Sequence, residues 1–250
     1  MFVVFRRPLP ERWLTQAEGV SFELKAGPLL AAGSRIELTD NTGQRVSQEL
    51  EPVPAPQSLL GPWRIAFKDG RGAPPELELP ALQSWTEHPD PDVRHYSGAA
   101  RYQHEVEVTR PTGSATAILD LGKVADIARV WINGNLAGTS WLPPHRLDAS
   151  RLLREGSNLI EIEVANRWIN RLIGDEALPT ELSYQEAGVS KFTDGRLLQL
   201  PGWLYEPTNR ASRKRHSFST WKHYKADAAL LPSGLIGPVT LEWHRPVHLR

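Results

Sequence analysis

The sequence predicts an all-β sandwich, and three observations indicate this fold class. Residues 128–132 and 159–164 alternate between apolar and polar side chains, as half-buried strands do. Between them lies Asn133-Gly134, a dipeptide that accepts the positive φ values of a tight hairpin turn. The 21 prolines and 19 glycines are spread along the chain, and no long amphipathic helix or internal repeat interrupts them. At 250 residues the chain is long enough for one large β domain or two small ones.

Residues 1–60 are predicted to form an incomplete β segment. Short strand candidates lie at 2–5, 20–24 and 36–38, a turn is expected at 41–43, and 53–57 (VPAPQ) has the composition of a linker. Because three or four strands bury little apolar surface alone, we expect this appendage to lean on the main domain.

The main domain is predicted to span 61–250. Before the hairpin we expect strands at 63–67, 101–109 and 115–121, and a loop at 85–92. After the hairpin, Asp148 is a suitable N-cap for a turn or two of helix ending at Gly156.

The second half of the main domain is predicted to be irregular. A polar loop is expected at 166–171, followed by an irregular region at 176–217. The last strand carries Val239, Leu241 and Trp243 on one face. A final strand that returns from a distant point to pair centrally is typical of a jelly roll.

Charge and composition exclude several classes of protein. Lys plus Arg and Asp plus Glu are equal at 29 each, which argues against nucleic acid and against an anionic membrane surface as partners. No apolar run approaches the roughly 20 residues of a transmembrane helix. The absence of cysteine excludes disulfides and thiolate-bound zinc. The apolar run in 1–8 is too short for a signal peptide, and the compartment stays open.

The common catalytic motifs are absent. We find no G-x-S-x-G, H-E-x-x-H, Walker A or G-x-G-x-x-G pattern. The eight histidines lack short metal-ligand spacing and are interpreted as surface or hydrogen-bonded core residues. The basic run 210–216 is interpreted as a solvated loop, with contact to a phosphate or an acidic sugar as the less favoured alternative.

Four segments carry a resemblance to a known family: 95–108, 119–150, 158–179 and 218–242. They resemble the sugar-binding jelly-roll domain of family 2 glycoside hydrolases and, more closely, the C-terminal region of family 106 α-L-rhamnosidases. The stretches NRWINRLIGD and LLPSGLIGPV are the more specific ones. The resemblance implies a galactose-binding-like sandwich and bacterial relatives that are periplasmic or extracellular. The catalytic barrel of family 106 has no counterpart in this chain.

A sugar site is predicted in the loops of this sandwich. A pyranose needs a flat aromatic face and several hydrogen-bonding groups around it. The predicted sugar-binding residues are Trp141, His145, Arg146, Asn166, Trp168, Asn170, Arg171 and Asp175.

Two other interpretations of these residues stay open. In the first, the two asparagines bond their own turns, Arg171 pairs with Asp175 four residues on, and Trp168 plugs the end of the sandwich. In the second, the exposed aromatic residues are interface residues that brace a catalytic barrel.

Catalysis by glycoside hydrolysis requires two carboxylates flanking the bond. Asp175 and Glu176 are the candidates, although turn or cap carboxylates are the favoured interpretation. The resemblance transfers no catalytic role, because the acids of family 106 lie on the barrel. No cofactor is required. A structural calcium ion, common in modules of this shape, is a further option, with Asp92, Asp120 and Glu242 as oxygen ligands.

The leading functional hypothesis is a carbohydrate-binding region of a family-106-like hydrolase that lacks the barrel and binds a rhamnose- or galactose-like sugar. One alternative is a compact glycosidase that uses loop carboxylates. Another is a non-catalytic subunit of a separate hydrolase chain, and a fragment of a longer hydrolase also stays open. Self-association or a separate catalytic chain would cover apolar surface that we expect to be exposed.

Overall fold

The computed structural model describes residues 13–20, 29–31, 35–68, 71–113, 115–179, 182–186, 188, 194–205 and 214–247. Strands dominate these residues, so the predicted all-β sandwich is confirmed. The strand candidate at 2–5 and most of that at 20–24 lie outside the described residues.

The strands are β1 (Leu14–Glu18), β2 (Leu29–Ala31), β3 (Arg35–Asp40), β4 (Arg45–Glu49), β5 (Gln57–Ser58), β6 (Trp63–Phe67), β7 (Glu76–Leu79), β8 (Ala99–Val108), β9 (Thr116–Asp120), β10 (Lys123–Ala125), β11 (Ile127–Ile132), β12 (Asn135–Ser140), β13 (Arg146–Asp148), β14 (Gly156–Ala165), β15 (Gly234–Gly237) and β16 (Thr240–Val247). The helices are α1 (Pro91–Arg94) and α2 (Ile169–Glu176), with 3₁₀ turns η1 (Trp85–Glu87) and η2 (Gly202–Leu204). Neither α-helix has the length and apolar character needed to cross a lipid bilayer.

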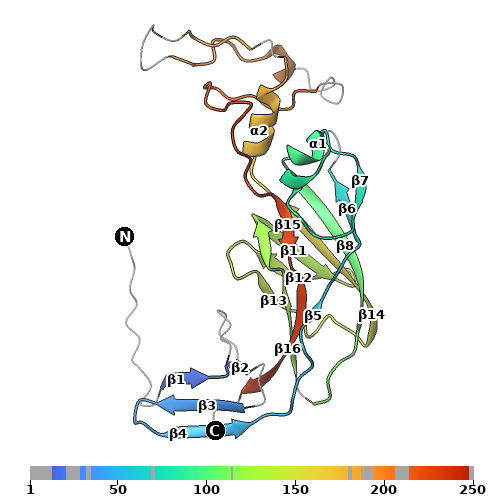
Figure 1. Cartoon of the computed structure of the whole chain (residues 1–250), viewed down its shortest axis with the longest axis vertical. Helices are drawn as coiled ribbons and strands as arrows, with labels where there is room; N and C mark the ends of the chain where they lie inside the picture. Colours follow the sequence, from blue (N-terminus) through green and yellow to red (C-terminus); the bar gives the residue numbers. More distant parts are fainter. Residues whose placement is uncertain are drawn as a thin grey trace.

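Two antiparallel sheets form the sandwich (Figure 1). One has six strands in the order β12-β11-β14-β8-β6-β7, and the other has the order β13-β9-β16-β2, with β5 also paired to β16. The core combines residues of both sheets, among them Tyr102, Ile162 and Leu119, none of which is exposed to solvent. Burial of each large apolar side chain contributes roughly 1.5–3 kcal/mol, so this core accounts for most of the stability of the fold.

The alternation predicted on β11 and β14 is confirmed. Ala128, Val130 and Ile132 are buried, while Arg129 lies exposed on the other face of β11. Since side chains alternate across a strand, the outer face of this sheet is polar. There Arg101 lies over the ring of Trp131, with 4.6 Å between guanidinium carbon and ring centroid.

The predicted hairpin at Asn133-Gly134 is confirmed and lies in the six-stranded sheet. Asn133 has φ 52° and Gly134 has φ 77°, and Ile132 pairs with Asn135 across the turn. Positive φ at both central positions defines a type I′ turn, whose twist matches that of the strands. The side-chain amide of Asn133 donates through Nδ2 to the Leu152 carbonyl and to Asn158 Oδ1. These bonds fix the turn against the neighbouring loop.

Gly134→Val is expected to lower the free energy of unfolding by about 2 kcal/mol, because a β-branched residue resists positive φ. A Cβ at this position meets nothing within 4 Å, so the effect isolates backbone strain. Gly134→Asn is the control, since Asn tolerates this conformation and should cost much less. Equal melting temperatures for wild type and Gly134→Val would contradict the expectation.

The structure corrects three local predictions. Residues 149–155 form a single turn and no helix. The Leu153 amide closes this turn by donating to the Ala149 carbonyl. The predicted loop 166–171 contains the start of α2, and the predicted loop 85–92 contains η1 and the start of α1. The helix α2 has only eight residues, and its apolar spacing is limited to Ile169, Leu172 and Ile173. It also buries polar side chains, which the sequence alone favours in a loop.

The N-terminal segment forms a three-stranded sheet, β1-β3-β4. The strand predicted at 36–38 and the turn at 41–43 are present, whereas β1 and β4 went unpredicted because they are mostly exposed and polar. A small apolar cluster of Ala31, Ile36, Leu38 and Val247 supports the sheet. Val247 belongs to β16, and β2 pairs with that strand, so this appendage leans on the main sandwich. The division at residue 60 stays a prediction.

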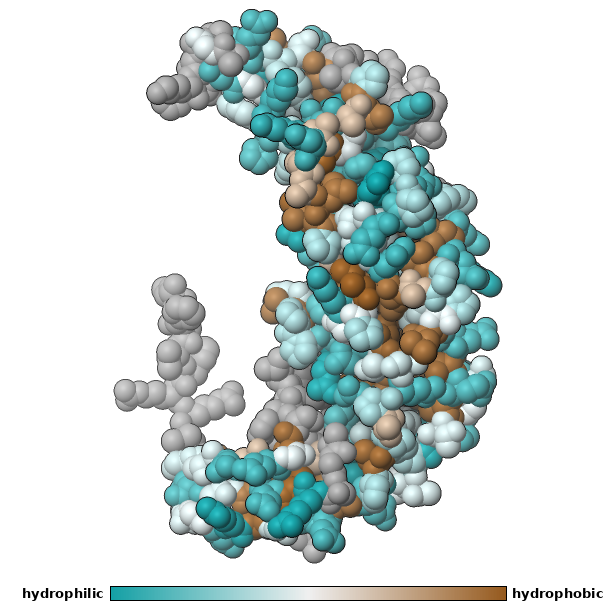
Figure 2. All heavy atoms as spheres, viewed as in Figure 1, coloured by the Kyte–Doolittle hydropathy of each residue, from teal (hydrophilic) through white to brown (hydrophobic). Residues whose placement is uncertain are grey.

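A long excursion between α2 and β15 projects from the other end of the sandwich. We call the described residues of 177–231 the arm. The small sheet and the arm extend to the same side, which gives the described chain a C-shaped outline (Figures 1 and 2). The arm has a little structure of its own: Trp203 packs edge-on against Phe218, and short bridges join Tyr184 to Leu197 and Arg196 to Trp221.

Candidate functional site

An open pocket of about 440 Å³ lies beside Trp141. Two parts of the chain build it: β10 with its flanking residues, and the loop between β12 and β13. The lining residues are Gly122, Lys123, Val124, Asp126, Trp141, Pro143 and His145. Two of the residues predicted from sequence, Trp141 and His145, therefore meet in one pocket.

Trp141 supplies the apolar surface of this pocket. Its side chain is 68% exposed, although tryptophan is usually well buried. An exposed indole beside polar groups is a suitable platform for a ligand that has one apolar face and several hydroxyl groups.

His145 forms the floor of the pocket and is buried. Its Nδ1 lies 2.9 Å from Ser140 Oγ, and its carbonyl accepts from the Leu121 amide, so the loop is tied to the end of β12 and to the residue that follows β9. Burial lowers the pKa of His145, and the smaller influence of Asp120 opposes this. The imidazole is therefore neutral at pH 7.

Asp126 is the carboxylate that lines the pocket. Arg167, which is not among the lining residues, forms an ion pair with it. The Arg167 Nε donates to Asp126 Oδ2 at 3.0 Å, and both side chains remain partly exposed. This ion pair joins the pocket to the loop that precedes α2. No donor among the described residues contacts Asp126 Oδ1, which is therefore available as an acceptor.

Arg146, also predicted as a sugar contact, does not line the pocket. It lies on β13, and its guanidinium pairs with Asp120 on β9 at 3.4 Å and with Glu242 on β16. His244 Nε2 adds a contact to Glu242 at 3.2 Å. Arg146 thus joins three adjacent strands of the five-stranded sheet.

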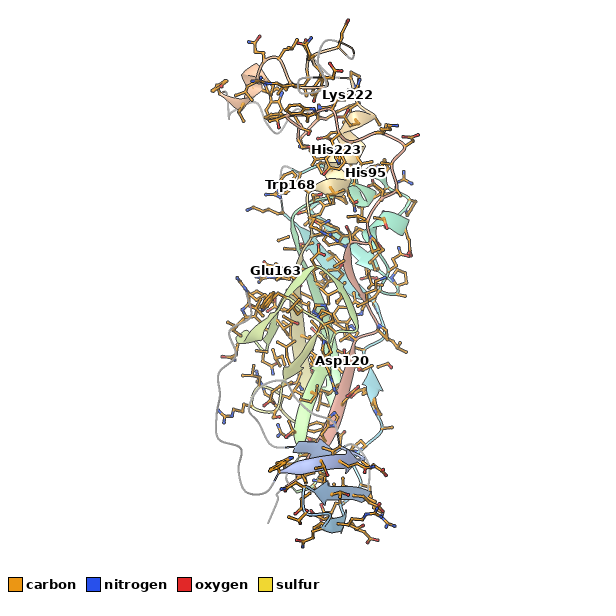
Figure 3. The ribbon with its side chains drawn as sticks, turned by 90° about the vertical axis from the view of Figure 1, so that its left-hand side faces the viewer. His95, Asp120, Glu163, Trp168, Lys222 and His223 are labelled. Atoms are coloured by element: carbon orange, nitrogen blue, oxygen red, sulfur yellow. The ribbon has the colours of Figure 1, made fainter. Side chains whose placement is uncertain are left out.

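The three oxygen ligands suggested for calcium do not form one set. Asp120 and Glu242 both contact Arg146, whereas Asp92 belongs to α1 near the opposite end of the sandwich (Figures 1 and 3). No group of three metal-ligating side chains occurs among the residues that the structure describes. The calcium site stays a prediction.

Asn166 and Asn170 form a polar network at the end of the sandwich. The Asn166 amide donates to the Tyr96 carbonyl and to Ser233 Oγ, and its Oδ1 accepts from the Gly98 amide. Asn170 donates to the same Ser233 hydroxyl and exchanges hydrogen bonds with the backbone of Leu231. These amides tie the start of α2 to the strand that returns from the arm.

Arg171 and Asp175 lie one turn apart on α2 and are both buried. Their Nε and Oδ1 atoms are 3.7 Å apart, in agreement with the i,i+4 pairing considered from sequence. Asp175 Oδ2 accepts from the His216 amide at 2.9 Å and from the Ser217 hydroxyl at 2.7 Å, and also from the Ser217 amide. Asp175 therefore fixes the arm to α2.

Glu176 takes part in the same junction. Its Oε1 accepts from Arg215 Nη2 at 2.6 Å, and the Arg215 side chain is only 10% exposed. The prediction that the run 210–216 is a solvated loop is wrong for Arg215, because its guanidinium is enclosed between two acceptors of α2. Residues 210–213 of this run lie outside the described residues. The catalytic assignment of Asp175 and Glu176 stays a prediction, and the geometry gives both a structural role.

Trp168 lies just before α2, apart from the pocket lining. Its ring is 46% exposed and lies 5.0 Å from the Arg71 guanidinium carbon. In Figure 3, Trp168 and His95 both lie at the base of the arm. Glu163 lies between Trp168 and Asp120 along the long axis of the molecule. The predicted set thus divides into a pocket, a cross-strand ion cluster and the junction with the arm.

Sequence reasoning missed Lys123 and Asp126. They lie on a three-residue strand and just after it, and no motif or periodicity distinguishes them. The pairing of β13 with β9, and the Leu121 amide that donates to the His145 carbonyl, bring the start of β10 beside the loop that carries Trp141.

Comparisons with known proteins show which class of protein contains this architecture. No family model matches the chain. A putative beta-glucuronidase of Formosa agariphila is 35% identical over 202 residues, which are 80% of this chain and 17% of that protein. A rhamnosidase of Novosphingobium sp. PP1Y has a TM-score of 0.57 at 27% identity, over 95% of this chain and 25% of that one.

A beta-D-glucuronidase of Dictyoglomus thermophilum also matches, with a TM-score of 0.45 and 21% identity over 77% of this chain and 28% of that one. The proteins similar to this chain are thus glycoside hydrolases, and it corresponds to a β-rich part of them. It spans about a sixth of the length of the curated relative.

Proposed function

We propose that this chain is a carbohydrate-binding, galactose-binding-like region related to family 106 glycoside hydrolases, and that it binds sugar in the pocket beside Trp141. The observation that carries this proposal is the exposed indole of Trp141 next to the hydrogen-bonding groups of Asp126 and Lys123. The similarity to a rhamnosidase over nearly the whole chain supports it.

The chemistry of the pocket fits a pyranose. One face of a sugar ring is a row of C–H groups that packs on an indole, and its hydroxyl groups both donate and accept. Asp126 accepts from such hydroxyls, and the ammonium of Lys123 donates to them. Because the pocket is open and supplies few contacts, Kd for a monosaccharide falls in the high-micromolar to millimolar range. Rhamnose-like and galactose-like sugars are the first ligands to test.

A catalytic partner is part of the same proposal. The chain corresponds to about a quarter of the rhamnosidase, so most of that enzyme has no counterpart here. The arm offers a surface for such a partner, because five of its large apolar side chains are 39–70% exposed, namely Leu198, Leu200, Leu204, Tyr205 and Trp221. On the face shown in Figure 2, apolar residues occur in separate patches between polar ones. A catalytic portion, on the same or another chain, would cover part of this surface.

Trp141→Ala is expected to reduce sugar affinity at least tenfold, because stacking on the indole is the main apolar contact. Rhamnose, galactose and glucuronate would be titrated to tens of millimolar and followed by NMR shift changes of the protein amides. Trp13→Ala is the matched control: this tryptophan is 42% exposed and precedes β1 in the small sheet, far from the pocket. Its removal should leave affinity unchanged.

The proposal fails if wild type shows no saturable shifts with any of these sugars. It also fails if Trp141→Ala binds as well as wild type, since the site would then lie elsewhere.

A further inference from the structure

We propose that the Trp141 pocket prefers a pyranose bearing an anionic group, a carboxylate or a sulfate, and that Lys123 is the residue that selects it. This inference rests on the proposed function and specifies the ligand class of the same pocket. It follows from the balance of charges around the pocket.

The one carboxylate that lines the pocket is already compensated. Asp126 is paired with Arg167 at 3.0 Å, so this pair contributes no net charge. The Arg167 side chain is 57% exposed, and only its Nε is used in that contact. Its Nη groups remain available to a ligand that reaches the rim.

Lys123, by contrast, has no compensating charge. It lines the pocket from β10 and is exposed, and its ammonium makes no ion pair or hydrogen bond with any residue that the structure describes. A lysine ammonium carries three donors and no acceptor, so an oxyanion is the partner that satisfies it best.

The remaining titratable side chain that lines the pocket, His145, does not cancel this charge. His145 is neutral at pH 7, because burial lowers its pKa. Asp120, the nearby carboxylate that opposes this shift, shares Arg146 with Glu242, so these three side chains carry one net negative charge; none of them lines the pocket. Among Lys123, Asp126, Arg167 and His145, the sum is one positive charge, so the pocket favours an anion over a neutral ligand of equal shape.

Lys123 and Trp141 come from different elements that line one pocket, β10 and the loop after β12. A ring stacked on Trp141 therefore has an ammonium within the same open space of about 440 Å³. The indole recognises the ring and the ammonium recognises its charge. A neutral sugar offers the ammonium only hydroxyl oxygens, whereas an anionic sugar offers it an oxyanion and so gains a charge-assisted contact.

The test compares charged and neutral ligands that share one pyranose ring, with glucuronic acid and glucuronamide as the pair of similar shape. Glucuronic acid, its neutral isostere glucuronamide, glucose and glucose 6-sulfate would be titrated at pH 7 into wild type, Lys123→Gln and Lys123→Arg, with NMR shift mapping as the readout. Lys222→Gln is the control, since Lys222 is exposed and lies on the arm (Figure 3).

Wild type should bind glucuronic acid about threefold to fivefold more tightly than glucuronamide, the size expected of one exposed ion pair. The preference should disappear in Lys123→Gln, persist in Lys123→Arg and Lys222→Gln, and shrink as salt rises from 20 to about 500 mM. If wild type also prefers glucose 6-sulfate over glucose by the same factor, the pocket recognises the charge alone. If the preference is restricted to glucuronic acid over glucuronamide, the pocket is a carboxylate site.

Two outcomes overturn the inference, and they differ from failure of the proposed function. If all four sugars bind equally, or if Lys123→Gln keeps the preference, the pocket binds sugar without selecting anions. If no sugar binds to wild type, the carbohydrate site itself is wrong.

Discussion

Asp175→Asn is expected to lower the free energy of unfolding by about 3–5 kcal/mol, the range for breaking one partner of a buried ion pair. The carboxylate is completely buried, and its Oδ2 accepts from three donors on His216 and Ser217. An asparagine oxygen in the Oδ2 position can still accept these bonds, but its NH2 group would then replace Oδ1 and face the buried Arg171 guanidinium. Arg171 would thus lose the carboxylate that lies 3.7 Å from its Nε and meet a second donor instead. Urea unfolding followed by tryptophan fluorescence measures the change as a shift of the midpoint.

Glu176→Gln is the control for this prediction. Glu176 is only partly buried and accepts from Arg215, so its loss should cost about 1 kcal/mol or less. The two variants also separate a structural from a catalytic role. If wild type hydrolysed nitrophenyl glycosides and Asp175→Asn removed this activity at unchanged stability, Asp175 would be a catalytic acid and the compact-glycosidase alternative would hold.

Gly234→Ala is expected to destabilise the fold by about 3 kcal/mol or more, because it combines overpacking with an unfavourable backbone conformation. Gly234 has φ 87°, and a Cβ there would lie 2.6 Å from both the Trp85 ring and Tyr102 Oη. These two side chains share a buried hydrogen bond, Trp85 Nε1 to Tyr102 Oη at 2.6 Å, and the same oxygen accepts from the Leu235 amide. Any shift that admits the methyl group disrupts both bonds.

Gly43→Ala is the matched control for Gly234→Ala. Gly43 has a similar φ of 82°, but a Cβ there meets nothing within 4 Å. It should therefore show the backbone strain alone, about 1 kcal/mol. The difference between the two melting temperatures measures the steric contact at the core. Equal effects would show that Trp85 and Tyr102 move aside without loss of stability.

The sequence by itself determined the sandwich strands and the central hairpin. On β6, β11 and β14 the alternation of side chains is a local pattern of period two, and burial of one face is enough to place it. Asn133-Gly134 likewise encodes its turn through the backbone preferences of two residues. Such signals need no knowledge of distant contacts.

Tertiary structure alone decided the roles of the polar residues. His145 and Arg146 are adjacent, yet one lines the pocket and the other bridges three strands, because His145 ends the loop before β13 and Arg146 is the first residue of that strand. Asn170 and Asp175 sit on a helix whose polar partners come from residues 216–233, some 40–60 positions later. Lys123 and Asp126 line one pocket with Trp141 because the pairing of β13 with β9 brings two separate parts of the chain together. The role of a polar side chain depends on the group with which it forms hydrogen bonds or ion pairs. Here those groups lie far away in the sequence, so no local pattern can specify them.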